Sequence, residues 1–169
     1  VTLQHEVSTE METYNLVKPT RAIFDFVDGL STWYIRRSRD RFKIGDSQAI
    51  ETLAYVLKEL SKIIAPFAPM SAEVIYMEFD NDKESVHLEE WPELDKKLVD
   101  GKVLTNMDAI KAIAEKAHAL RAKSGMKVRQ PLASLEIKDI KLAKNYISIL
   151  EDELNVELIQ SVKEVNTGD

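Results

Sequence analysis

A helical repeat of apolar residues restricts the fold of this chain more than any other feature. The repeat is clearest over 50–64, where apolar side chains recur every three or four residues. This spacing places them on one face of an α-helix. The same pattern predicts a helix over Pro19–Lys43, in which Gly29 is a weak point for a bend or break. Its apolar positions are Ile23, Phe26, Val27, Leu30 and Tyr34.

Capping and breaking residues set the predicted helix ends. Asp46 or Ser47 is expected to cap the helix that contains 50–64. The two prolines that follow are expected to interrupt it, and a short helix restarts and runs through 73–79. After a turn-rich segment, Thr105 is predicted to begin a long helix that Gly125 closes.

The apolar period changes in the last third of the chain. Apolar and polar residues alternate over 134–138, which predicts a strand. Asp139 is expected to cap a further helix, and Val156–Val162 to form a second strand. We therefore predict a mainly α fold. A helical bundle over 1–98 is followed by a small α+β appendage, a helix-strand-helix-strand subdomain over 99–169.

Charge is distributed unevenly along the chain, whose formal net charge is −6. The first basic island, Tyr34–Lys43, holds five basic residues and one acidic residue. The second basic island, Lys102–Arg129, holds seven basic residues and two acidic ones. Basic islands on an acidic body are typical of a localised phosphate-binding surface. The alternative is that each island is only a solvated helix face.

Helical spacing separates the basic residues of the first island. Three of them are expected opposite the apolar face, where they form a solvent-facing stripe: Arg36, Arg39 and Lys43. Arginine suits such a stripe because its planar fork binds phosphate oxygens bidentately; a bond from Arg36 to Asp40 is the alternative. Arg37 and Arg41 are expected nearer the apolar face, paired with acids or snorkelling. Trp33, at the edge, could stack on a base or pack in the core.

Catalytic and metal-binding patterns are absent from the sequence. There is no cysteine, the five glycines are scattered, and the three histidines lie far apart. We therefore expect no active site, no metal site and no cofactor in this segment. No apolar run approaches the roughly 20 residues of a membrane helix, and no signal peptide is recognisable. We expect a cytoplasmic protein without a membrane partner.

Five sequence strings resemble one enzyme family. LSTWYIRRSRDRF at Leu30–Phe42 and IIAPFAPMSAEVIY at Ile63–Tyr76 resemble the anticodon-binding domain of class I aminoacyl-tRNA synthetases for isoleucine, leucine, valine and methionine. ESVHLEEWPE at Glu84–Glu93, MKVRQPLASLEI at Met126–Ile137 and EDELNV at Glu151–Val156 are similar to landmarks of the isoleucyl branch. The strings occur in the order of the family.

The resemblance implies a helical bundle followed by a junction element that docks the anticodon stem-loop of the isoleucine tRNA. It also implies a catalytic core in the parent chain, where ATP and Mg support ligation of isoleucine to its tRNA. The ATP-site signatures HIGH and KMSKS are absent from the present chain. The expected tRNA-binding residues are Trp33, Arg36, Arg37, Arg39, Arg41, Lys43, Lys127, Arg129 and Gln130.

Two other interpretations stay open at the sequence level. The chain could be the equivalent domain of a leucyl, valyl or methionyl relative, although the strings at Glu84–Glu93 and Met126–Ile137 speak against this. It could also be a helical protein-interaction module that has lost RNA binding. Lys43 supports that interpretation, because the family usually has Trp at this position.

Overall fold

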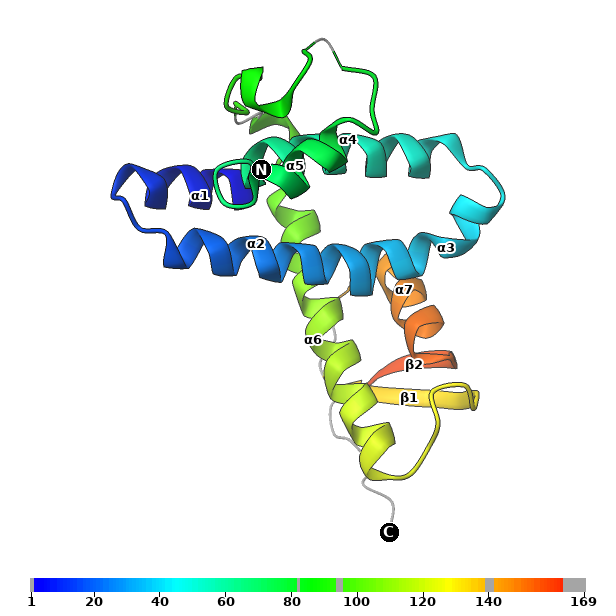
Figure 1. The fold of residues 1–169 in the computed structure, drawn as a ribbon. Helices are drawn as coiled ribbons and strands as arrows, with labels where there is room; N and C mark the ends of the chain where they lie inside the picture. Colours follow the sequence, from blue (N-terminus) through cyan, green and yellow to red (C-terminus); the bar gives the residue numbers. More distant parts are fainter. Residues whose placement is uncertain (1, 82, 94–95, 139–141, 163–169) are drawn as a thin grey trace. The chain divides into compact units, whose positions relative to one another are not determined.

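The chain folds into two compact units, residues 1–99 and 100–169. The structure, a computed structural model, describes residues 2–81, 83–93, 96–138 and 142–162. Helices dominate both units, and one small sheet lies in the second (Figure 1). The predicted mainly α fold with a small α+β appendage is therefore confirmed.

All regular secondary structure in the described residues of the first unit is helical. Its α-helices are α1 (Thr2–Glu12), α2 (Val17–Gly29), α3 (Arg36–Lys43), α4 (Ser47–Ile64) and α5 (Pro69–Tyr76). A π-helical turn, η1 (Leu30–Ile35), joins α2 to α3, and the 3₁₀ turns η2 (Val86–Leu88) and η3 (Lys96–Leu98) follow α5. The core contains Leu3, Val7, Leu60, Ile63, Ile64, Ala72, Tyr76 and Val86.

The predicted helix over Pro19–Lys43 is one continuous helical run, but its irregularity differs from the expectation. Gly29 keeps right-handed helical backbone angles and does not break the run. The change begins one residue later, at η1. A π-helical turn accommodates an extra residue, so the residues after it are rotated by about 100° relative to a continuous α-helical wheel.

The covered side chains of the run agree only in part with the predicted apolar face. Ser38 is buried on α3, whereas Phe26 and Val27, expected on the apolar face, are 36% and 39% exposed. Phe26 instead borders an apolar hollow of about 100 Å³ beside Leu3 and Leu60. The wheel prediction is confirmed for Ile23 and Leu30, which pack against the core. Phe26 and Val27 belong to the same predicted face but are covered only in part.

Capping explains the observed helix ends. Asp46 caps α4 as predicted, because its Oδ1 accepts a bond from the Ala49 amide at 3.2 Å. The short helix begins at Pro69 and ends at Tyr76, before the predicted end at Phe79. A proline suits this start because the first helical residue needs no amide donor.

The second unit consists of α6 (Gly101–Lys123), β1 (Leu132–Lys138), α7 (Lys144–Leu154) and β2 (Val156–Val162). The two strands are parallel, with Leu132 opposite Val156 and Lys138 opposite Val162. Side chains from α6, α7 and β2 are buried in this unit: Ile110, Ala114, Ala117, Leu150, Leu154, Val156 and Ile159.

The start of α6 corrects one prediction. The helix begins at Gly101 rather than Thr105, because the Asp100 carboxylate accepts bonds from the Lys102 and Val103 amides at 2.9 and 3.2 Å. Its end agrees with the prediction, since Gly125 takes the left-handed conformation with φ of 69°. The proposed cap at Asp139 lies outside the described residues.

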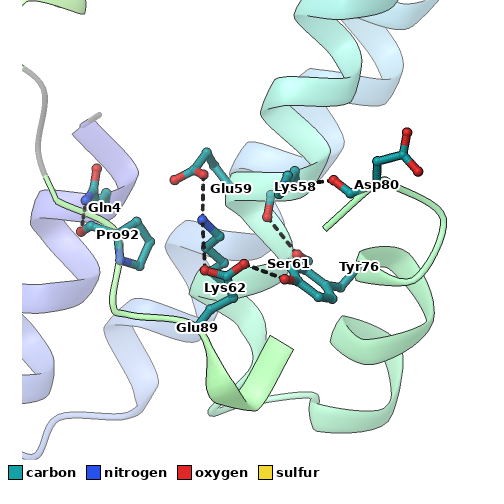
Figure 2. A network of polar contacts seen from close by, with 9 residues as sticks. All are labelled: Gln4, Lys58, Glu59, Ser61, Lys62, Tyr76, Asp80, Glu89 and Pro92. Atoms are coloured by element: carbon teal, nitrogen blue, oxygen red, sulfur yellow. Dashed lines mark hydrogen bonds and ion pairs between the residues drawn. The ribbon is translucent and has the colours of Figure 1, made fainter. Parts of the chain in front are cut away.

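A polar network links three elements of the first unit (Figure 2). The buried Tyr76 hydroxyl on α5 donates to Glu89, which follows η2. Lys62 on α4 lies 3.7 Å from Glu89 Oε2 and 3.0 Å from Glu59 Oε1. The bond from Tyr76 and the nearby Lys62 charge lower the pKa of the Glu89 carboxyl below its usual range.

None of the helices in the described residues is long and apolar enough to cross a membrane.

Candidate nucleic-acid interface

The basic stripe on α3 is exposed, as helical spacing predicts. Arg36, Arg39 and Lys43 all lie on the solvent side of the helix. The Arg36 Nε donates to the Thr32 carbonyl one turn earlier at 2.7 Å. Lys43 forms an ion pair with Asp40 at 3.0 Å, with both side chains well exposed. Such exposed pairs are weak, so a phosphate can compete for the cation.

Arg39 differs from its neighbours because no described residue forms a hydrogen bond or ion pair with its side chain. It therefore keeps its full donor capacity for an incoming anion. A guanidinium that already spends its donors within the protein would have to break those bonds first. Arg39 is for this reason the residue of α3 best suited to bind a phosphate.

Trp33 and Arg37 form a stacked pair at the junction of η1 and α3. The Arg37 guanidinium lies over the Trp33 ring, 5.6 Å from its centroid. Both side chains are half-buried. This cation–π contact covers part of the indole face and orients Arg37. The Trp33 ring therefore packs partly against the protein, as one interpretation expects, and its remaining surface borders the solvent. Stacking of this ring on a base stays a prediction.

Arg41 is less buried than the wheel suggests, but it has the acidic partner expected from the sequence. Its Nε donates to Asp46 Oδ2 at 2.8 Å, and its side chain is 48% exposed. This bond, together with the Ala49 amide, holds the pKa of the Asp46 carboxyl below its usual value. Asp46 in turn raises the pKa of Arg41. Arg41 therefore supports the turn between α3 and α4.

The second set of expected binding residues lies on the loop between α6 and β1. Lys127, Arg129 and Gln130 are all exposed there. The Gln130 amide donates to the Lys127 carbonyl at 3.0 Å, which closes a turn around Val128 and Arg129. The loop thus presents two cations and one amide side chain from adjacent positions. We call Lys127–Gln130 the basic loop.

The structure brings together the residues within each set. The α3 stripe belongs to the first unit and the basic loop to the second. That both sets border one surface stays a prediction. Sequence reasoning missed Arg121, a buried residue of the second island that contacts the basic loop. The described residues contain no group of three or more His, Cys, Asp or Glu that could hold a metal ion.

Comparisons with known proteins agree on one family. The family model for the anticodon-binding domain of tRNA ligase matches residues 2–138. An isoleucine–tRNA ligase of Protochlamydia amoebophila is 38% identical over 93% of this chain. Those of Streptomyces coelicolor and Clostridium acetobutylicum are 34% and 36% identical over 96% and 94% of it. The chain spans 16% of the length of each relative.

Proposed function

The chain belongs to the family of anticodon-binding domains of tRNA ligases, and we propose that it docks the anticodon stem-loop of an isoleucine tRNA. The relatives named above are isoleucine–tRNA ligases. We further propose that the chain acts as part of such a ligase. In that enzyme a separate catalytic core in the cytoplasm uses ATP and Mg to ligate isoleucine, and this segment holds no cofactor.

The exposed α3 stripe carries the proposal. An RNA stem-loop presents regularly spaced phosphates, and cations held on a helix can meet several of them without sequence preference. Arg39 contributes an uncommitted guanidinium, while Arg36 and Lys43 flank it on the same face. Phosphate contacts would dock the RNA, and base contacts would have to supply any specificity.

Binding of the 169-residue chain to an isoleucine tRNA anticodon stem-loop tests the proposal, with an acceptor-stem hairpin as the control RNA. We expect the anticodon hairpin to bind more tightly. We also expect affinity to fall steeply with salt, by a slope of about 0.7 to 0.9 for each phosphate contact. Absent or salt-independent binding would support the protein-interaction module instead.

Specificity requires a second comparison. A leucine or valine tRNA hairpin, tested at the same salt concentration, should bind more weakly than the isoleucine hairpin. Equal or tighter binding of either would favour the corresponding relative. Salt must be matched in this experiment because the phosphate contribution dominates affinity and is shared by all tRNAs.

A further inference from the structure

Arg121 is the buried cation of the second unit. It lies in the last turn of α6, and only 4% of the residue is exposed. Its Nη1 donates to the Leu154 carbonyl at 3.1 Å. Its Nη2 donates to the carbonyls of Lys127 and Val128 at 3.1 and 3.3 Å, and also to that of Gln130. Three of these four acceptors belong to the basic loop.

The surroundings of Arg121 supply hydrogen-bond acceptors rather than a counter-charge. No described carboxylate forms an ion pair with it. A buried charge is costly unless its donors are satisfied, and here four carbonyl oxygens satisfy most of them. The carboxyl end of α6 adds a favourable negative dipole. The loop carbonyls thus stabilise the buried guanidinium, and the guanidinium in turn holds the loop in its conformation.

A second donor supports the same loop. Asn155, which ends α7 in the left-handed conformation with φ of 51°, donates its Nδ2 to the Val128 carbonyl at 3.3 Å. Its own carbonyl accepts a bond from the Leu132 amide at 3.1 Å, where β1 begins. The loop backbone is therefore held from two directions, by Arg121 and by Asn155.

This arrangement determines what the basic loop presents to solvent. Three loop carbonyls, whose oxygens would repel a phosphate, are turned toward Arg121. The side chains of Lys127, Arg129 and Gln130 remain exposed. We infer that Arg121 is a positioning residue for RNA binding, one that shapes the basic loop into a phosphate-binding surface without touching the RNA. This inference rests on the proposed function.

The test measures tRNA affinity against salt for the 169-residue chain, and hydrogen exchange at the Gln130 amide. We expect Arg121→Met to speed that exchange and to lower the salt slope by at least about 1, because phosphate contacts are lost. Arg121→Lys should not restore the slope, since an ammonium has three donors and lacks the planar fork. Full recovery by Arg121→Lys would contradict the positioning role.

Two control variants separate this role from charge and from stability. Lys123→Met removes an exposed cation from the same end of α6 and should leave Gln130 exchange unchanged. Ile110→Val loosens the core of the same unit and should leave the salt slope unchanged at temperatures well below melting. If either control reproduces both effects of Arg121→Met, the inference is wrong.

Asn155→Gly is a less disruptive variant, which tests the inference even if Arg121→Met does not fold. Asn155→Gly keeps the left-handed backbone favourable and removes only the side-chain donor to Val128. It should change the slope and the exchange rate in the same direction, by less. Steep binding by the wild-type chain with no change in these variants would overturn the inference alone. Absence of RNA binding by the wild-type chain would overturn the proposed function together with it.

Discussion

Arg39 and Arg41 of α3 differ in their interactions, although only one residue separates them in the sequence. Arg39 is exposed and bonds to no described residue. Arg41 is committed to Asp46, which also caps α4. The first is free to bind an external anion, and the second stabilises a turn of the protein itself. Sequence composition alone counts both as equal members of a basic island.

Substitution should separate these tasks. Arg39→Ala is expected to weaken tRNA binding across sequences and to lower the salt slope by about 1, with a stability change within about 0.5 kcal/mol. Arg41→Ala should instead lower the Tm, because Asp46 loses its partner. Binding titrations at several salt concentrations and thermal unfolding of both variants check this. Equal loss of affinity without any loss of Tm would contradict the division.

Asp46→Asn provides the matched control for Arg41→Ala. Asparagine is as good an N-cap as aspartate, so this change removes the ion pair and keeps the cap. Its effect on Tm should equal that of Arg41→Ala, and the double variant should be little worse than either. Full additivity would show that the two residues do not act through each other.

At the scale of elements, the Tyr76–Glu89–Lys62 network fastens the segment after η2 to α4 and α5. The lowered pKa of Glu89 means that its charged form favours the folded state. Its contribution is complete above the usual glutamate pKa of about 4.3. It is lost as the pH falls through the lower folded-state pKa. Acid should therefore weaken this junction.

Tyr76→Phe removes the hydroxyl that donates to Glu89. We expect it to lower the free energy of unfolding at neutral pH by about 1.5–3 kcal/mol, the range for a hydrogen bond to a charged group. The difference from wild type should shrink when the pH is lowered from neutral to well below the usual glutamate pKa of about 4.3, because protonation removes the charged acceptor. Urea unfolding at both pH values measures this. A difference that stays constant with pH would mean that the hydroxyl acts through packing alone.

At the scale of the whole molecule, the two expected RNA contacts lie in different units. If both touch one tRNA, their phosphate contacts should contribute together to a single salt slope. An Arg36→Ala/Arg39→Ala variant and a Lys127→Ala/Arg129→Ala variant should each reduce the slope by about 2 at most. The combined variant should lose the sum of the two reductions. If either pair of substitutions has no effect, that island does not bind the RNA.

The 169-residue chain should not activate isoleucine. It contains neither a glycine-rich phosphate loop nor the ATP-site signatures of class I synthetases, and its five glycines are scattered. Isoleucine-dependent pyrophosphate exchange with a purified sample should therefore equal the buffer control. Exchange above that control, in a preparation free of other ligases, would overturn the assignment of catalysis to a separate core.

The sequence by itself determined most helices and both strands, because periodicity and capping are local. The cap at Asp46, the closure at Gly125 and the limits of Val156–Val162 all depend on neighbouring residues. The family landmarks were likewise legible in short strings, and the comparisons support that family.

Only the tertiary structure decided which basic residue of the second island is buried. In the first island, regular helical spacing already predicted the exposed stripe of α3, although it did not predict the π-helical turn η1. Arg121 is one of seven basic residues in its island, and nothing in its local sequence predicts burial. It is buried because the carbonyl of Leu154, 33 residues away, and those of the basic loop converge on its guanidinium. Long-range contacts of this kind exist only once the chain has folded.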